Sequence, residues 1–389
     1  MTIALSATGT ALGMAVAVMT LCGVAATAAA QVVVSANDNK LTLNDGVQTV
    51  VNNPPSDTVT VIDVSGAQPK VVGEVRVPTS IVGPPSSVAI TTDGSLAFVT
   101  AAQKVDPADR TKVIPDDTVS VIDLKASPLA VLATLRAGAG ASGVSVNRAG
   151  TLALVANRME GTVSVFTISG RTVTAAGKVD LGAPQSGPSG VVFTPDGRSA
   201  LVTRNNDSLI SILSVDGSKV TYAKRDIGAG FKPYGIEIAG DVAIVGNIGA
   251  GTTGGGVDVV NVIDLTGPSP RAIAHLPAGP TVEGVSISPD GRYVAATVMN
   301  GSNSPKASPA FNDFGILKVY SLANKVLTPV AETHIGHWCQ GSAWTRDSKT
   351  VLVQCAVERE IQVFMFDGKT LKPAAPVKVN GGPSGIRTN

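Results

Sequence analysis

The sequence is poor in the residues that most often carry chemistry. Its 389 residues include 3 cysteines, 3 histidines and 2 tryptophans, and aromatic residues make up 4%. Charged residues make up only 15% and nearly cancel to a net charge of +1. Because there is no basic excess and no interleaving of basic with aromatic residues, we expect neither nucleic acid nor an anionic membrane surface as a partner.

The abundant residues are those of tight turns. The chain has 42 glycines and 24 prolines beside a hydrophobic fraction of 44%, which is typical of a turn-rich β protein. Residues 187–227 show how the turns are used. They contain four short apolar segments separated by turn residues such as Asp196-Gly197: 190–194, 199–203, 209–214 and 220–226. This pattern predicts four consecutive antiparallel strands.

The start of this four-stranded unit recurs along the whole chain. Its seven copies are Pro85-Ser86-Ser87-Val88, Ala141-Ser142-Gly143-Val144, Pro188-Ser189-Gly190-Val191, Pro233-Tyr234-Gly235-Ile236, Val282-Glu283-Gly284-Val285, Cys339-Gln340-Gly341-Ser342 and Pro383-Ser384-Gly385-Ile386. Their spacing of roughly 44 to 57 residues is in the range of propeller blades. We therefore predict an all-β, seven-bladed β-propeller with four antiparallel strands per blade, in one domain spanning residues 31–389.

The first blade lacks an innermost strand at its N-terminal end. Residues 31–36 resemble a second strand, and the missing first strand is found at 383–388. We predict that this C-terminal strand completes blade 1 and closes the ring, because closure satisfies the edge hydrogen bonds that an open array would expose.

Residues 1–30 have the features of a signal peptide. Residues 11–26 are almost wholly small or apolar, and Ala28-Ala29-Ala30 before Gln31 fits a cleavage site. The first residues depart from the pattern because they contain no Lys or Arg. An uncleaved anchor is the alternative, although the apolar run is short for a spanning helix. Cleavage would leave a mature protein without a membrane span, periplasmic or secreted, in a bacterium.

Long loops between the second and third strands are expected in blades 1, 2, 5 and 6. They are residues 37–57, 103–117, 249–256 and 301–315. In an antiparallel blade these loops lie at the same end as the connectors between blades. We predict that this loop-rich face, around the mouth of the central channel, carries the function. We interpret the glycine-rich segment 249–256 as a flexible loop.

The repeats resemble bacterial YVTN-type propellers and, more distantly, seven-bladed lactonase-like propellers. The residues that carry the resemblance are 188–198, the second strands 154–157 and 201–204, and the third strand 118–123. It covers essentially all of residues 31–389. The resemblance implies the fold and says little about function, because the matching residues are turn glycines and strand residues. The lactonase-like branch includes lactone hydrolases and cycloisomerases.

Cys339 and Cys355 are the two cysteines that would remain after signal cleavage. Counting back from the turn at 346–349 places them almost opposite each other on neighbouring strands. Such a pair is close enough for a disulfide, and an exported protein meets an oxidising compartment. Two alternatives are a pair of buried thiols and a metal site with His334, His337 and Glu358. Because the spacing is unlike the usual zinc sites, we expect no metal and no cofactor.

One set of polar residues could converge on the channel mouth and act as acids, bases or anion ligands. The candidates for catalysis are Glu283, His337, Arg158 and Arg204. A His or Glu as general base beside an Arg that holds a carboxylate is what lactone opening or closure needs. The alternative is a set of solvated rim residues and rim ion pairs.

A second set is suited to ligand binding. Its members are Tyr234, Glu283, His337, Trp338, Gln340, Phe311 and Phe314. The two phenylalanines belong to the polar blade 6 insertion, which is either a flap over the pocket or an ordered surface loop. We interpret the protein as an exported, monomeric binding propeller for a small molecule or an envelope protein. The alternative is an enzyme of lactonase or cycloisomerase type.

Overall fold

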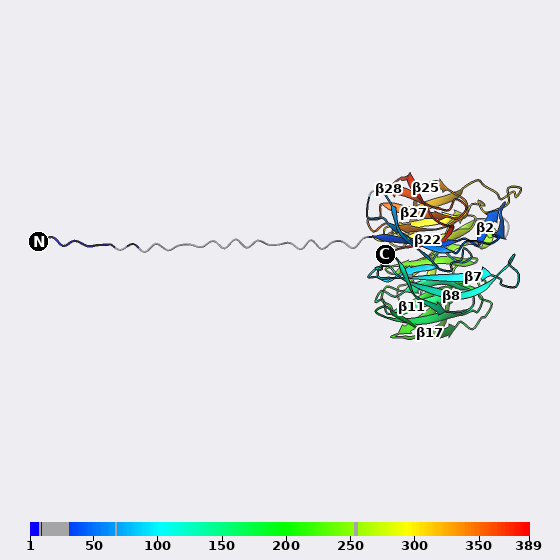
Figure 1. Ribbon diagram of the computed structural model, residues 1–389, viewed down its shortest axis with the longest axis horizontal. Helices are drawn as coiled ribbons and strands as arrows, with labels where there is room; N and C mark the ends of the chain where they lie inside the picture. Colours follow the sequence, from blue (N-terminus) through cyan, green and yellow to red (C-terminus); the bar gives the residue numbers. More distant parts are fainter. Residues whose placement is uncertain (8, 10–30, 67, 253–255) are drawn as a thin grey trace. The chain divides into compact units, whose positions relative to one another are not determined.

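Each repeat of the sequence forms one four-stranded antiparallel sheet, and the seven sheets are the blades of a β-propeller (Figure 1). This computed structural model describes residues 1–7, 9, 31–66, 68–252 and 256–389, so most of the predicted signal peptide lies outside the described residues. Within the described ranges, no helix is long and apolar enough to cross a membrane. The predicted fold class is confirmed.

The innermost strands contact one another around the ring. In the order of blades 1 to 7 they are β30 (Gly382–Thr388), β6 (Val88–Ile90), β10 (Ala141–Val146), β14 (Pro188–Phe193), β18 (Pro233–Ala239), β22 (Val282–Ile287) and β26 (Cys339–Trp344). The second strands are β1 (Val32–Asp38), β7 (Leu96–Val105), β11 (Leu152–Asn157), β15 (Ser199–Arg204), β19 (Val242–Asn247), β23 (Tyr293–Val298) and β27 (Thr350–Cys355).

The outer half of each blade is more exposed than the inner half. The third strands are β4 (Thr58–Asp63), β8 (Val113–Asp123), β12 (Thr162–Ser169), β16 (Leu209–Asp216), β20 (Asp258–Asp264), β24 (Gly315–Ala323) and β28 (Glu360–Phe366). The outermost strands consist mainly of exposed and half-buried residues. They are β5 (Lys70–Arg76), β9 (Ala130–Arg136), β13 (Thr172–Asp180), β17 (Lys219–Gly228), β21 (Arg271–Gly279), β25 (Val326–Ile335) and β29 (Leu371–Lys378).

Blade 1 is built from both ends of the propeller domain, as predicted. Strand β1 lies between β30 and β4, and Val34 is paired with Arg387 across the β1–β30 ladder. The side-chain oxygen of Asn389 also accepts a hydrogen bond from the backbone N–H of Val32 at 2.9 Å. The C-terminal strand therefore supplies the hydrogen-bond partners that β1 would otherwise lack.

The core consists of apolar layers between neighbouring blades. Phe98 of blade 2 and Phe166 of blade 3, for example, belong to one buried cluster together with Val144. Burial of each such side chain contributes about 1.5–3 kcal/mol. Because every blade packs on two neighbours, the stacking makes the ring one continuous structure.

The glycine in the third position of the repeat is required by the closeness of neighbouring inner strands. A Cβ atom on Gly235 would lie 2.5 Å from the carbonyl oxygen of Glu283, and one on Gly284 would lie 2.4 Å from that of Gln340. Threonines on the second strands bridge the same blades. Thr203 Oγ1 donates a hydrogen bond to the carbonyl oxygen of Tyr234 at 2.8 Å, and Thr297 Oγ1 donates to that of Gln340 at 2.8 Å.

Two insertions contain regular structure that the sequence interpretation missed. The blade 1 loop forms a hairpin of β2 (Leu41–Asn44) and β3 (Val47–Val50). Its turn residues Asp45 and Gly46 both have positive φ, which two-residue hairpin turns require. The segment expected to be a flexible loop in blade 5 begins instead with a single helical turn, α1 (Gly249–Thr252).

Candidate functional site

The second residue of the repeat forms a ring around the channel, at the start of each inner strand. The members of this channel ring are Ser86, Ser142, Ser189, Tyr234, Glu283, Gln340 and Ser384. In blades 1 and 3 to 7 the strand pairing shifts register around this residue. Such bulges re-aim a side chain, here away from the ladder. Four small serines leave room for the three larger polar residues of blades 5, 6 and 7.

Arg158 joins three blades above the ring. It follows β11 of blade 3, and its guanidinium donates a hydrogen bond to Ser189 Oγ at 2.7 Å. The guanidinium carbon also lies 5.3 Å from the centre of the Tyr234 ring, which permits a cation–π interaction. Burial raises the pKa of Tyr234 further than the charge of Arg158 lowers it, so the phenol stays neutral.

Glu283 and Gln340 extend the polar cluster to blades 6 and 7. Glu283 is half-buried on the channel wall, and Gln340 is 2% exposed. Burial raises the pKa of Glu283 to about 7, against the opposing effects of a hydrogen bond from Gln340 and the charge of Arg158. A carboxyl group with a pKa near neutrality can exchange a proton at physiological pH.

The connector from blade 1 to blade 2 covers this cluster. The backbone N–H of Gly83 bonds the Tyr234 hydroxyl, and Gln340 Nε2 donates to the carbonyl oxygen of Ile81 at 3.0 Å. The Ile81 side chain packs in a buried apolar cluster with Leu41 of the hairpin and Trp338. The channel mouth is therefore closed over by a connector and then by the β2–β3 hairpin.

The channel has little free space below the ring. One or two residues further along the inner strands, a cavity of about 20 Å³ is lined by Ser86, Gly235 and Arg387 among others. This volume holds roughly one water molecule. Arg387 forms an ion pair with Glu237 there. A sugar-sized ligand therefore does not fit below the ring in this conformation.

A roomier pocket lies on the loop-rich face, and His337 lines it. The pocket has a volume of about 280 Å³ and lies between the β2–β3 hairpin, the blade 6 insertion and the blade 7 connector. Its lining comprises Leu43, Asp45, Gly46, Ser302, Ser304, Lys306, Phe311, Asp313, His337 and Val357. The pocket thus combines apolar walls with hydroxyl groups and charges of both signs.

His337 is held between two carboxylates. Its Nδ1 lies 2.6 Å from Glu358 Oε1, and its Nε2 lies 3.0 Å from Asp313 Oδ1. Burial alone would lower the pKa of His337, but the hydrogen bonds and negative charges of Glu358 and Asp313 outweigh it and raise the pKa. The imidazole is therefore more strongly protonated at neutral pH than a free histidine.

Two insertions meet to form the roof of this His337 pocket. The backbone N–H of Lys306 donates to Asp45 Oδ1 at 2.9 Å. Gly46 lies so close to the insertion that a Cβ atom there would be 2.0 Å from the nitrogen of Pro305. Within the described chain, the ammonium group of Lys306 forms no ion pair, and the residue is exposed. It remains free to meet a ligand anion.

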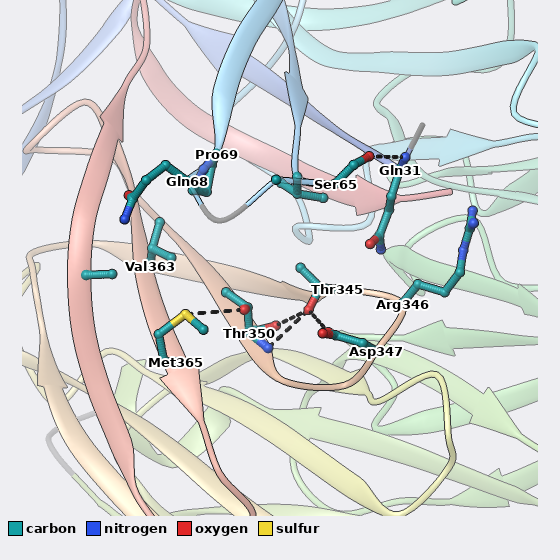
Figure 2. Close-up of a pocket in the computed structure, with 13 residues that line it drawn as sticks. Gln31, Ser65, Gln68, Pro69, Thr345, Arg346, Asp347, Thr350, Val363 and Met365 are labelled. Atoms are coloured by element: carbon teal, nitrogen blue, oxygen red, sulfur yellow. Dashed lines mark hydrogen bonds between the residues drawn. The ribbon is translucent and has the colours of Figure 1, made fainter. Parts of the chain in front are cut away.

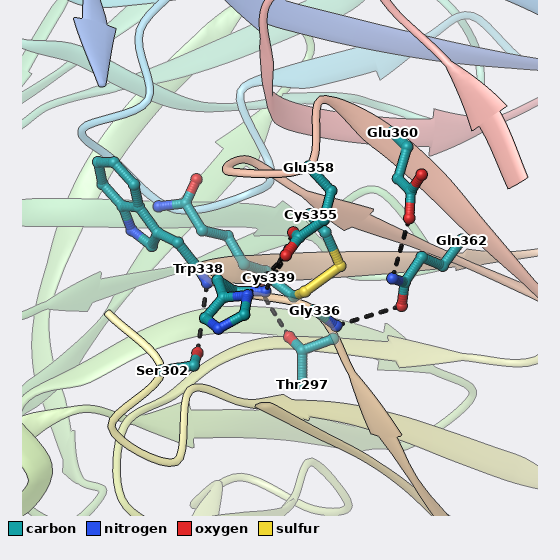
Figure 3. The surroundings of a disulfide bond; sticks show 11 residues. Thr297, Ser302, Gly336, Trp338, Cys339, Cys355, Glu358, Glu360 and Gln362 are labelled. Atoms are coloured by element: carbon teal, nitrogen blue, oxygen red, sulfur yellow. Dashed lines mark hydrogen bonds and ion pairs between the residues drawn. A yellow bond between two sulfur atoms is a disulfide. The ribbon is translucent and has the colours of Figure 1, made fainter. Parts of the chain in front are cut away.

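The predicted disulfide between Cys339 and Cys355 is present beneath this pocket (Figure 3). The two residues lie opposite each other on β26 and β27 and are almost fully buried. Figure 3 shows Glu358 beside the disulfide, and its carboxylate accepts the backbone N–H of His337 at 3.0 Å. Because the two sulfurs are bonded to each other, they cannot act as the thiolate ligands of the alternative metal site.

The remaining predicted residues lie outside both clusters. Arg204 is 6% exposed and pairs with Asp207 and Asp226 within blade 4, which leaves it no part in the channel ring. Trp338 is 3% exposed and packs in the apolar cluster beneath the hairpin. Phe314 stacks on His334, with ring centres 3.6 Å apart, and only Phe311 lines the His337 pocket.

The sequence interpretation had expected Glu283 and His337 to share a cavity, and the structure separates them. Asp313 and Lys306 were not singled out, although both line the His337 pocket. Their place in a long polar insertion was the only signal, and the contact between that insertion and the hairpin is not visible in the sequence. Glu358 was considered as a metal ligand and as a rim residue that could lie near His337, and it does contact His337 through hydrogen bonds to its backbone N–H and its Nδ1.

The opposite face of the propeller carries the short turns and has larger hollows than the His337 pocket. One of about 530 Å³ lies between blades 1 and 7 and is lined by Gln31, Ser65, Thr345 and Met365 among others (Figure 2). Figure 2 shows the hydrogen bonds of Thr345 directed at its own turn, to Asp347 and Thr350. Similar grooves between other blades follow from the repetition of the blades.

Comparison with known proteins shows the fold. No protein-family model and no curated protein sequence matches the chain. Solved structures that resemble it include a putative 6-phosphogluconolactonase from Bacteroides uniformis, with a TM-score of 0.71, 16% identity, and coverage of 92% of this chain and 99% of that one.

Two further solved structures resemble it to a similar degree. One is a putative 6-phosphogluconolactonase from Bacteroides fragilis, with a TM-score of 0.70, 17% identity, and coverage of 93% and 99%. The other is a periplasmic gluconolactonase from Pseudomonas aeruginosa, with a TM-score of 0.65, 17% identity, and coverage of 92% and 98%. At this identity the likeness shows the fold alone, a seven-bladed β-propeller.

Proposed function

We propose that the protein is an exported propeller that binds a small molecule in the His337 pocket on its loop-rich face. The single observation that carries this proposal is which segments of the chain line the pocket. Its lining comes from two insertions and the atypical blade 7 connector, which a bare propeller scaffold does not need. Loops positioned on a rigid scaffold are where binding sites are usually found.

The chemistry of the lining favours a hydroxylated carboxylic acid as the ligand. The unpaired ammonium of Lys306 and the protonated His337 favour an anion, and the hydroxyls of Ser302 and Ser304 suit ligand hydroxyl groups. Phe311 supplies an apolar face. Export is supported by the disulfide, which forms in oxidising compartments, and by the signal-like residues 1–30.

A thermal-shift screen with sugar acids, their lactones and aromatic acids tests this proposal. A ligand that binds only the folded protein raises the midpoint of unfolding. We expect a hit that disappears in His337→Ala and in Lys306→Ala. Arg204→Lys is the matched control, because Arg204 lies outside the pocket. A hit that persists in both pocket variants would place the ligand elsewhere, and a flat screen would favour a protein partner.

A second candidate function is lactone hydrolysis or cycloisomerisation at the channel ring. It is favoured by the carboxyl group of Glu283, whose pKa of about 7 suits a general base, beside the guanidinium of Arg158. The connector over the ring would have to move to admit a substrate. Hydrolysis of gluconolactones, measured by acid release, should then fall about 100-fold or more in Glu283→Gln. An unchanged rate would remove this candidate.

A further inference from the structure

Arg158, the cation above the channel ring, has no direct ion-pair partner among the described residues, and the carboxyl group whose charge acts on it is that of Glu283. Arg158 bonds Ser189 Oγ and Asn205 Oδ1 and faces the ring of Tyr234, all of which are neutral. It forms no ion pair with any carboxylate in the described part of the chain. A partly buried guanidinium that lacks a counter-charge is costly unless another anion compensates it.

The ring also contains hydroxyl groups without partners. The Oγ atoms of Ser86 and Ser142 are buried and have no hydrogen-bond partner among the described residues, and Ser142 is 1% exposed. These serines belong to neighbouring blades 2 and 3. A Cβ atom on Gly143 would lie 3.0 Å from Ser86 Oγ, and one on Gly83 would lie 3.1 Å from Ser142 Oγ. Buried hydroxyls normally have a partner, and each can donate a hydrogen bond.

We propose that the channel ring binds one monovalent anion, a halide ion or the carboxylate of a small organic acid, through Arg158 and the hydroxyls of Ser86 and Ser142. The inference does not rest on ligand binding at His337 or on turnover of a lactone. Gly83 links these groups: a Cβ atom there would lie 3.1 Å from Ser142 Oγ, and its backbone N–H bonds the hydroxyl of Tyr234, whose ring Arg158 faces.

The available groups favour an anion over a cation. Arg158 and the two serines can donate on this side of the channel, whereas the backbone N–H of Gly83 already bonds the Tyr234 hydroxyl. The other charges that face the channel, Arg387 and Glu237, are paired with each other. The guanidinium of Arg158 repels a metal cation and attracts an anion.

Glu283 couples this site to protons. Its Oε2 and the Oε1 of Gln340 are both acceptors that lack a donor, and one proton on Glu283 lets the carboxyl group donate to the amide. An ionised Glu283 supplies the negative charge opposite Arg158 when the site is empty. A bound anion supplies this negative charge instead and repels the ionised carboxylate, so it favours the protonated form of Glu283. The groups that face Glu283 are Arg158, Tyr234 and Gln340, of which only Arg158 is charged.

Anion binding is therefore expected to take up a proton. Affinity should be highest and nearly constant at pH values below 7, where Glu283 is protonated without the anion. Above the pKa of Glu283, which is about 7, the affinity for the anion should fall about tenfold per pH unit, because Glu283 takes up one proton each time an anion binds.

The test is a titration of the protein with sodium chloride, bromide and formate, followed by thermal shift and calorimetry at constant buffer composition. We expect a saturable rise of the midpoint that is lost in Arg158→Gln and retained in Arg148→Gln, which changes an arginine in a turn on the other face. Ser142→Ala should weaken binding about fivefold and keep the fold. No saturable effect in the parent protein, or an equal effect in Arg158→Gln, would overturn the proposal.

Two further readouts separate the parts of the proposal. Crystals soaked in bromide should give one anomalous peak at Arg158. If formate displaces that peak, the site also binds the carboxylate of a small organic acid. If formate does not displace it, the site binds a halide ion and the carboxylate is ruled out. Glu283→Gln should bind the anion with an affinity that no longer depends on pH. A parent protein whose affinity is equally flat between pH 6 and 9 would overturn the proton coupling.

Discussion

Arg387, two residues before Asn389, forms an ion pair with Glu237 across the central channel. Arg387 belongs to β30 of blade 1 and Glu237 to β18 of blade 5, so the pair joins opposite sides of the ring. The second carboxylate oxygen of Glu237 accepts the backbone N–H of Ile287 in blade 6 at 2.6 Å. The closing strand is therefore held by its ladder with β1 and also by a contact across the channel.

Removal of this cross-channel pair should weaken ring closure. Because both side chains are largely buried and Glu237 would lose its counter-charge, Arg387→Ala should lower the free energy of unfolding by about 1–3 kcal/mol. Urea denaturation measures the effect, and Arg346→Ala in a turn of blade 7 is the control. Equal stability of the two variants would show that the pair contributes nothing to closure.

The threonine bridge between blades 4 and 5 gives a second prediction. Thr203 Oγ1 donates to the carbonyl oxygen of Tyr234 and accepts the backbone N–H of Gly190, and all three groups are buried. Thr203→Val keeps the shape and removes the hydroxyl, which leaves both backbone groups unsatisfied. We expect a loss of about 1–3 kcal/mol in the free energy of unfolding. Thr172→Val on an exposed position of β13 should change stability by less than about 0.5 kcal/mol.

The disulfide should stabilise the blade 7 connector. Cys339 and Cys355 are separated by 16 residues in the sequence, and a bridge across a loop of this size contributes about 3 kcal/mol. The double variant Cys339→Ala/Cys355→Ala should therefore lower stability by about 2–4 kcal/mol under non-reducing conditions. A reducing agent should destabilise the parent protein and leave the double variant unchanged. An equal response of both would show that the bridge does not form in solution.

The protonation of His337 should make stability depend on pH. Its pKa is raised in the folded protein above the ordinary value of 6.5, so the stabilising charge is fully present below pH 6.5 and is lost as pH rises through the folded-state pKa. The stability difference between the parent and His337→Gln should therefore be largest near pH 6 and shrink towards pH 9. Because the site is half-exposed, we expect at most about 1 kcal/mol.

A titration of the His337 ring by NMR checks the cause of that effect. The titration midpoint should lie above 6.5 in the parent protein and fall in Asp313→Asn, which removes one of the two carboxylates. A midpoint at or below 6.5 in the parent protein would contradict the ion pairs with Asp313 and Glu358.

The repeats in the sequence were sufficient to predict the architecture. Turn glycines, alternating apolar residues and the recurring four-residue starts specify seven four-stranded sheets, because these features act within a few residues of each other. The closing strand and the Cys339–Cys355 pair also followed, since both depend on the register of one repeat. The β2–β3 hairpin could have been found as well, because Asp45-Gly46 between alternating residues is a strong hairpin signal.

The sequence by itself therefore determined the blades, the ring of equivalent residues from Ser86 to Ser384 and the disulfide. Only the tertiary structure decided how the loops meet. It separated His337 from Glu283, committed Arg204 to ion pairs within blade 4, buried Trp338 and brought Lys306 beside the hairpin turn at Asp45. The physical reason is that blade geometry is set by local hydrogen bonds and periodicity. The contacts between insertions depend on side chains from blades that are distant in sequence, whose approach no local pattern encodes.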